Sequence, residues 1–143
     1  MTPKHVISIL TIKISITDSA NSASALYSGH KSTVNCLGVY ADSSPDLFDD
    51  PKVETIAELF KRHIGGAVGI VSTAYIADAT PGGFTAHTRD RGQYGAVIDS
   101  YLNGITNYTW TNWTGVDVLF GGGAENFLNS TFEGESYQDK DCK

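Results

Sequence analysis

The apolar run from Ala67 to Ile76 constrains the fold of this 143-residue chain more than any other feature. Gly65 and Gly66 precede the run, and a polar loop that contains Asp78 follows it. A short apolar run between such breakers is typical of a parallel strand that is buried on both faces. Because helices must cover a buried parallel strand, we expect helices before and after the run.

Helical patterns do occur on both sides of this run. The small residues of 19–27 favour a helix, and Gly29 suits its end. Apolar residues recur at helical spacing over 52–63, where Pro51 suits the first helical position, and again over 94–102. These patterns predict three helices that pack against the strand.

Two further strands complete the predicted fold class. The isoleucine-rich segment 1–15 indicates a leading strand, and the short apolar run 116–120 indicates another. The order of strand, helix, helix, strand, helix, strand predicts a layered α/β/α fold with a mainly parallel sheet. We expect one domain over 1–143, with 133–143 as a polar tail.

Composition excludes several classes of function. With 41% hydrophobic and 18% charged residues, the chain should fold rather than remain disordered. A net charge of −6 without a basic stripe argues against a nucleic-acid-binding surface. No stretch approaches the roughly 20 apolar residues of a membrane span, and Lys13 interrupts the apolar N-terminus, so we predict neither a span nor a signal peptide. Any anion site in this acidic chain must be built locally.

Three asparagines carry the N-glycosylation pattern: Asn107, Asn112 and Asn129. Their clustering favours a secreted protein, or one of the secretory pathway or vacuole. The two cysteines, Cys36 and Cys142, could form a disulfide in that setting or remain unpaired thiols.

Candidate site residues follow the predicted strands, in the segments 17–22, 77–87 and 121–125. Ligands in parallel α/β folds bind at the carboxyl ends of strands. Ser19 would lie at a strand-to-helix turn, where free N–H groups and the helix dipole favour a phosphate and an activated hydroxyl. The alternative, favoured by local spacing alone, is that Asp18 and Ser19 only cap the helix.

A second cluster, Asp78 and Thr80, offers the hard oxygen ligands that magnesium prefers. The alternative is an Asx-type turn before a short helix over 81–88. Arg89 and Arg91 lie close behind, and an arginine fork matches the geometry of phosphate, although most arginines are solvated surface residues.

Together these segments resemble the alkaline phosphatase family. ITDSANSAS at 16–24 resembles the active-site signature, and STAYIADATP at 72–81, continuing to Arg91, resembles the next conserved block. GHKSTVNCLGVY lies between the two blocks, and the resemblance extends over 16–127. Asn21 and Ser24 depart modestly from the signature, which usually has a very small residue and a threonine there.

The resemblance implies hydrolysis of small phosphate monoesters through a phosphoserine intermediate. It implies that Ser19 attacks phosphorus, that Arg91 rather than Arg89 holds the phosphate oxygens, and that Asp18 helps to orient Arg91. His87 matches a family histidine without an assigned role. A homodimer is implied for the family's full-length proteins.

The resemblance also implies three metal ions. Two zinc ions would act on the attacking and leaving oxygens, with Ser19 contacting one of them, and Asp78 and Thr80 would belong to a magnesium site. Most of the family's zinc ligands and a magnesium glutamate have no counterpart in this sequence. We therefore expect a fragment with little or no activity alone.

Two other functions remain open on the residues. A serine hydrolase would need a histidine base and a G-x-S-x-G elbow, whereas Ser19 lies in T-D-S-A-N. A non-catalytic or degenerate domain that keeps only an anion site is the other alternative.

Overall fold

The computed structural model describes residues 17–104 and 113–127. In these ranges the element order is α2 (Ser19–Ser28), α3 (Ile56–Ile64), β1 (Gly69–Tyr75), α4 (Ala79–Gly82), α5 (Tyr94–Leu102), β2 (Val118–Gly122) and a 3₁₀ turn, η1 (Ala124–Phe127). This order agrees with the predicted alternation of helices and strands. The predicted leading strand 1–15, the tail 133–143, Cys142 and all three glycosylation candidates (Asn107, Asn112 and Asn129) lie outside the described residues.

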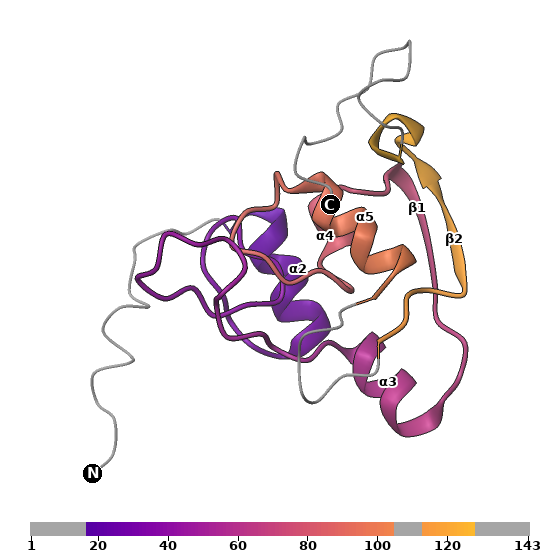
Figure 1. Cartoon of the computed structure of the whole chain (residues 1–143), viewed down its shortest axis with the longest axis horizontal. Coiled ribbons are helices and arrows are strands. Elements are labelled where there is room, and N and C mark those ends of the chain that lie inside the picture. Colours follow the sequence, from indigo (N-terminus) through magenta and orange to yellow (C-terminus); the bar gives the residue numbers. More distant parts are fainter. Residues whose placement is uncertain (1–16, 105–112, 128–143) are drawn as a thin grey trace.

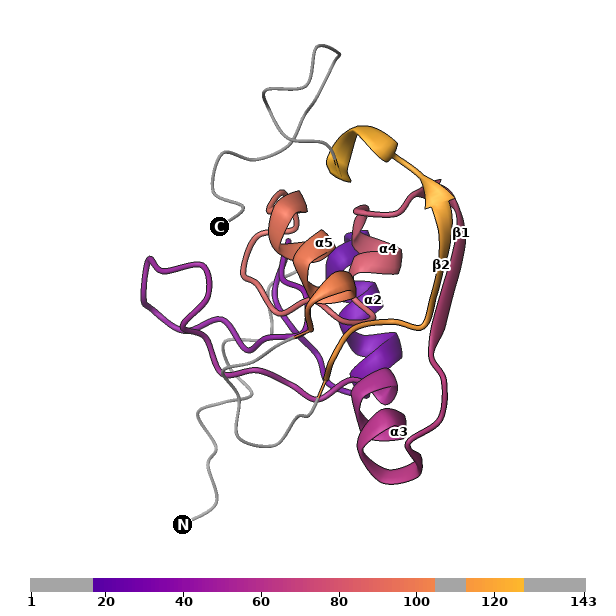
Figure 2. The same ribbon diagram turned by 45° about the vertical axis from the view of Figure 1, so that its right-hand side comes forward.

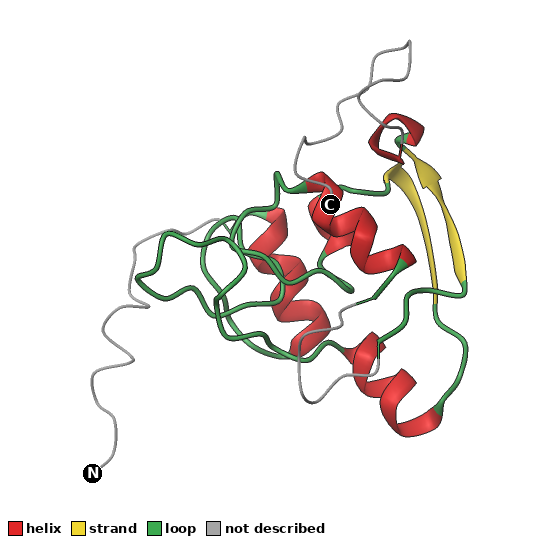
Figure 3. Cartoon of the chain, in the orientation of Figure 1, coloured by secondary structure: helices red, strands yellow, loops and turns green. Residues whose placement is uncertain are grey.

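The elements form layers. Strands β1 and β2 run along one side of the molecule, and helices α2, α4 and α5 lie together on one side of them in both orientations (Figures 1 and 2). Helix α3 lies near the start of the strands, and η1 lies near their carboxyl ends (Figure 1). Long loops connect these elements, most of them beside α2 (Figure 3). The arrangement is part of an α/β fold with a parallel sheet.

Local caps explain the ends of α2. Asp18 is the N-cap, and Gly29 ends the helix in the left-handed region with a φ of 73°. Both positions agree with the sequence-based prediction, because the two signals lie within the helix ends themselves. Helix α5 likewise spans 94–102 as predicted.

The predicted start of α3 is wrong, because the helix begins at Ile56, five residues after Pro51. Pro51 does not begin the helix; Lys52 instead forms an antiparallel bridge with Val39. The helix begins after Thr55, whose hydroxyl accepts from the Glu58 N–H while the Glu58 carboxylate accepts from the Thr55 N–H. This capping box satisfies two backbone donors, which a proline cannot do, and it therefore fixes the helix start.

The short helix predicted over 81–88 is also displaced. Helix α4 begins at Ala79, directly after its N-cap Asp78, so Pro81 occupies the third rather than the first helical position. The carboxylate of Asp78 accepts from the Ala79 N–H at 2.7 Å, which fixes the earlier start. Residues 83–88 continue as turns and a bridge, with Thr88 paired to Leu37.

The strand prediction is confirmed in direction and wrong in burial. Strands β1 and β2 pair in parallel, with Gly69 opposite Val118 and Val71 opposite Phe120. Val71 is 76% exposed and Phe120 is 65% exposed, whereas Ile70 is only 7% exposed. The helices cover one face of these two strands, and no described residue covers the other, so an apolar run that predicts two buried faces has only one.

The core lies between the sheet and the helices. Leu37, Val97, Ile76 and Tyr101 are each at most 1% exposed. The Tyr101 hydroxyl donates to the Ile76 carbonyl at 2.9 Å, which ties α5 to the end of β1. Within the described ranges, no helix has the length and apolar character to cross a membrane.

Candidate active site

Four of the predicted site residues meet at the carboxyl end of β1: Asp18, Ser19, Asp78 and Arg91. Asp18 and Ser19 stand at the start of α2, Asp78 follows β1 and caps α4, and Arg91 comes from the loop before α5. Residues separated by 72 positions are thereby in hydrogen-bond contact.

Ser19 is in direct contact with the guanidinium of Arg91. The Arg91 Nη1 donates to the Ser19 Oγ at 2.5 Å, and the serine is half-buried as the first residue of α2. A donor from a fixed positive charge favours the ionised form of a hydroxyl. No hydrogen bond joins Ser19 to a described histidine: His30 bonds Tyr40, His87 bonds Glu58, and His63 lies in the last turn of α3. This arrangement does not supply the histidine base that a serine hydrolase needs.

Asp18 combines the capping role and the site role that the sequence left open. Its carboxylate accepts from the N–H groups of Ala20 and Asn21 at 3.3 and 3.2 Å, and from that of Asn35 at 3.1 Å. It also lies 4.0 Å from the Arg91 Nη1. The expectation of free N–H groups at this helix start is therefore wrong for Ala20 and Asn21, whose N–H groups Asp18 already occupies.

Arg91 joins the two ends of the site. Its Nη2 donates to the Asp78 Oδ1 at 2.5 Å while its Nη1 contacts Ser19. The arginine side chain is 27% exposed, so solvent and small ligands can reach it. Two carboxylates and one guanidinium surround Ser19, which leaves a formal charge of about −1 and would disfavour a phosphate dianion in the absence of further cations.

Asp78 is held from three directions. Its Oδ1 accepts from the Arg91 guanidinium, from the Ala79 N–H and from the Tyr75 hydroxyl at 3.2 Å. The Tyr75 hydroxyl also lies 3.2 Å from that of Tyr94, and this hydrogen bond is the main reason why the pKa of Tyr75 is raised. The Asx-type turn and the contact with Arg91 therefore coexist. Thr80 lies two residues further along, exposed in α4.

Arg89 lies with the acidic loop 41–51 rather than with Ser19. Its guanidinium contacts both oxygens of Asp50, whose side chain is fully buried, and also Asp42. Hydrogen bonding from Arg89 is the main reason why the pKa of Asp50 is lowered. Asp42, Asp49 and Asp50 bring carboxylate oxygens within 4.8 Å of one another, a spacing suited to a cation, and Arg89 already supplies a positive charge there.

His87 is buried and contacts Glu58 and Gly38 rather than Ser19. Its Nε2 lies 2.9 Å from the Glu58 Oε1, and its Nδ1 lies 2.6 Å from the Gly38 carbonyl, to which only a protonated nitrogen can donate. Glu58 at the same time completes the α3 capping box. Sequence reasoning missed Glu58, although the spacing of Thr55 and Glu58 is a capping-box signature that could have revealed it. It also missed Tyr75, Tyr94 and Asp50, which no local pattern singles out.

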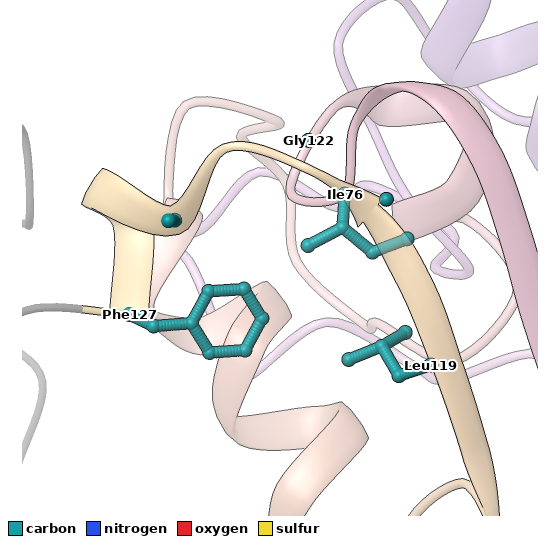
Figure 4. A pocket seen from close by; sticks show the side chains of 6 residues that line it. Ile76, Leu119, Gly122 and Phe127 are labelled. Carbon is teal, nitrogen blue, oxygen red and sulfur yellow. The ribbon is translucent and has the colours of Figure 1, made fainter.

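The third predicted segment, 121–125, borders an apolar cavity. The cavity has a volume of about 370 Å³ and is lined by Ile76, Leu119, Gly121, Gly122, Ala124 and Phe127. The side chains of Ile76, Leu119 and Phe127 face a common space beside the end of β2 (Figure 4). The residues that this segment contributes to the cavity lining, Gly121, Gly122 and Ala124, carry no polar side chain. Gly123, with a φ of 88°, lets the chain pass close to the Cβ of Tyr75.

A family model described as "Alkaline phosphatase" matches residues 8–142. Alkaline phosphatase 3 of Bacillus subtilis is 34% identical over 112 residues, which cover 78% of this chain and 22% of the relative. Streptomycin-6-phosphate phosphatase of Streptomyces griseus is 35% identical over 127 residues, covering 83% of this chain and 27% of the relative. The chain thus spans about a quarter of the length of these relatives.

Solved alkaline phosphatase structures are similar in fold to this chain. The alkaline phosphatase of the Antarctic bacterium TAB5 has a TM-score of 0.62 at 27% identity, covering 89% of this chain and 31% of that one. A variant of the TAB5 enzyme with magnesium bound has a TM-score of 0.60 at 29% identity, covering 78% of this chain and 27% of that one. These neighbours support the interpretation of the described elements as part of a larger α/β fold.

Proposed function

This chain belongs to the alkaline phosphatase family, and on that premise we propose that it carries the nucleophile and the phosphate-binding arginine of a metal-dependent phosphate monoesterase. The observation that carries the proposal is the pair of 2.5 Å contacts from Arg91 to Ser19 and to Asp78. They join, at one point, three residues that the sequence motifs single out independently.

Ser19 is the proposed nucleophile. Its Oγ would attack the phosphorus and take the phosphoryl group, giving a phosphoserine that water then hydrolyses. The positive end of the α2 dipole and the Arg91 donor both favour negative charge on this oxygen. Because no described histidine bonds Ser19, the hydroxyl proton must leave by another route, and solvent can reach this half-buried residue.

Arg91 is the proposed phosphate ligand. A guanidinium binds two oxygens of a phosphate through parallel N–H donors. Both of its terminal nitrogens already have partners, so a phosphate would replace Asp78 and remain beside Ser19. Asp18, at 4.0 Å, would keep the guanidinium in place during this exchange.

Magnesium fits the donor set in part. Asp78 provides a carboxylate and Thr80 a hydroxyl, the hard oxygen ligands that this ion takes, and the excess negative charge beside Ser19 favours a cation. A bound magnesium ion would neutralise charge on the phosphoryl group. Zinc takes histidine, cysteine and carboxylate ligands in tetrahedral sites. Beside Ser19 the described residues offer the carboxylates of Asp18 and Asp78, which fit zinc only in part, while His30 and His87 bond other side chains.

We expect little or no turnover from this chain alone. The test is hydrolysis of p-nitrophenyl phosphate with added zinc and magnesium, comparing the chain with its Ser19→Ala variant. Equal background rates are the expected result. Robust turnover that disappears in Ser19→Ala would contradict this expectation and would show that the chain assembles a complete catalytic centre.

The alternative is an anion-binding domain without catalysis. Calorimetric titration with inorganic phosphate, with and without magnesium, separates the two proposals. Tighter binding with magnesium supports a site built for metal-dependent chemistry, whereas binding that is independent of magnesium supports the alternative. The proposed substrates are small phosphate monoesters, a class that includes the compound named for the Streptomyces griseus relative.

A further inference from the structure

Arg89 directs its whole guanidinium into one loop. Its Nε donates to the Asp50 Oδ2 at 2.9 Å, and its Nη2 donates to the Asp50 Oδ1 at 2.5 Å. The remaining contacts are with Asp42, through both its carboxylate and its carbonyl, and with the Ser44 carbonyl. A planar fork with this many partners fixes the side chain and the backbone that carries it.

Asp50, the partner of Arg89, is itself held in place. Asp50 is 1% exposed, and its Oδ1 also accepts from the Asp42 N–H at 2.8 Å, which closes the loop on itself. A buried carboxylate of this kind is costly to leave without its cation. The ion pair is therefore unlike an ordinary exposed pair, which contributes little.

The same segment carries Arg91, two residues further along. The Arg89 N–H donates to the Leu47 carbonyl at 3.0 Å, and the Arg91 N–H donates to the Asn35 carbonyl at 2.9 Å. Asn35 in turn donates its N–H to Asp18. The backbone between the two arginines is held by the acidic loop on one side and by the residues beside Ser19 on the other.

We propose that Arg89 is a positioning residue for phosphate binding: its ion pair with Asp50 sets the place of Arg91 beside Ser19. This inference rests on the proposed function, since it assigns Arg89 to the same phosphate site. Arg89 does not contact the phosphate. It acts by anchoring the short segment from which Arg91 reaches Ser19 and Asp78.

The first test measures the placement of Arg91 without any phosphate. The full chain is treated briefly with phenylglyoxal, which modifies accessible guanidinium groups, and modification of Arg91 is quantified by mass spectrometry. We expect Arg91 to react about fivefold faster in Arg89→Lys and in Asp50→Asn, because a lysine cannot reproduce the fork and an amide cannot hold its charge.

A matched control is available in α3. Arg62 makes a similar two-point pair with Glu54, at 2.7 and 2.8 Å, on the surface. Arg62→Lys should leave the reactivity of Arg91 unchanged. Unchanged reactivity in both Arg89→Lys and Asp50→Asn would overturn the inference, as would an equal rise in Arg62→Lys.

The second test is a double-mutant cycle on affinity for inorganic phosphate. Arg89→Lys should weaken binding about tenfold in the natural chain and less than twofold when Arg91 is already lysine, since Arg89 acts through Arg91. A purely structural role predicts the same loss in both backgrounds and would overturn the inference. If Arg89→Lys does not fold, Asp50→Asn takes its place in the cycle.

The two tests separate failure of this inference from failure of the proposed function. If the natural chain shows no phosphate binding, the proposed phosphate site is wrong, and the reactivity of Arg91 alone decides whether Arg89 positions it. If phosphate binds and the Arg89 variants bind it equally well, the phosphate site stands and the role of Arg89 is wrong.

Discussion

Two regions of the molecule differ in how completely the described residues cover their apolar side chains. In the site region, residues 17–55 and 76–104, Leu37 and Val97 are fully buried. In the sheet region, residues 56–75 and 113–127, Val71 is 76% exposed and Ile64 is 70% exposed. Exposed large hydrophobic side chains are concentrated in the sheet region, although Leu26 in the site region is also 72% exposed.

The two regions differ in the contacts that hold them together. The site region contains polar groups that satisfy one another over long sequence distances, such as Arg89 with Asp50 and Arg91 with Ser19 and Asp78. The sheet region has helices on one face of two strands. The described residues thus bring together the proposed phosphate-binding groups without covering the sheet, in a chain that spans about a quarter of the length of its relatives.

The largest expected effect compares one substitution in the two regions. Leu37→Ala should lower the free energy of unfolding by about 3 kcal/mol, because it leaves a cavity at a fully buried position. Leu59→Ala, at a position in α3 that is 42% exposed, should cost less than about 1 kcal/mol. Urea unfolding followed by circular dichroism measures both values. Similar losses of unfolding free energy in the two variants would contradict the claim that the two regions differ in packing.

The exposed strand face should govern self-association rather than stability. Large uncovered apolar patches promote association. Replacing Val71 and Phe120 by lysine should therefore raise the monomer fraction in analytical ultracentrifugation and change the free energy of unfolding by no more than about 1 kcal/mol. A strongly destabilised double variant would show that this face is packed in solution.

Acid should weaken the contribution of the Asp50 carboxylate in the site region. The pKa of Asp50 is lowered below its ordinary value of 3.8, chiefly by hydrogen bonding from Arg89. A lowered native pKa contributes stability that is present above 3.8 and is lost as the pH falls through the native value, so the difference between the natural chain and Asp50→Asn should shrink there.

The comparison carboxylate is in the sheet region. The pKa of Asp117 is also lowered, first by hydrogen bonding from Lys61, but its side chain is 42% exposed. Added salt should weaken the contribution of Asp117 and leave that of Asp50 nearly unchanged. Unfolding curves of Asp50→Asn and Asp117→Asn at low and high salt test this, and equal salt sensitivity would contradict it.

The smallest expected effect concerns the tyrosine pair behind Asp78. Tyr94→Phe removes the hydroxyl that lies 3.2 Å from that of Tyr75, and it should lower the free energy of unfolding by about 1 kcal/mol or less. Tyr75 keeps its hydrogen bond to Asp78 in this variant, so phosphate affinity should change less than twofold. A larger loss of affinity in a phosphate titration would assign Tyr94 to the site itself.

Features with local causes could be predicted from the sequence. The ends of α2 follow from Asp18 and Gly29, and the parallel direction of β1 follows from the order of the elements. The start of α3 was missed because two local signals compete, and the capping box of Thr55 and Glu58 outweighs Pro51. The exposure of Val71 was missed because burial depends on which other elements cover a strand.

The candidate site also contains residues that the sequence could predict and contacts that it could not. The motifs singled out Asp18, Ser19, Asp78 and Arg91, which the fold brings together. The anchor of Arg89 could not be predicted, because Asp50 lies 39 residues away and only the folded loop brings the two together. The capping role of Asp18 could be predicted, whereas its contact with Asn35, 17 residues away, depends on the folded loop.

The central claim is that Ser19 and Arg91 form one phosphate site. Amide NMR of the full chain titrated with inorganic phosphate and magnesium tests it most directly, with Arg91→Lys as the paired variant. The account predicts that shift changes concentrate at residues 18–20, 78–79 and 91, and that Arg91→Lys weakens the apparent affinity at least about tenfold. Shift changes centred elsewhere, or an unchanged affinity in Arg91→Lys, would contradict it.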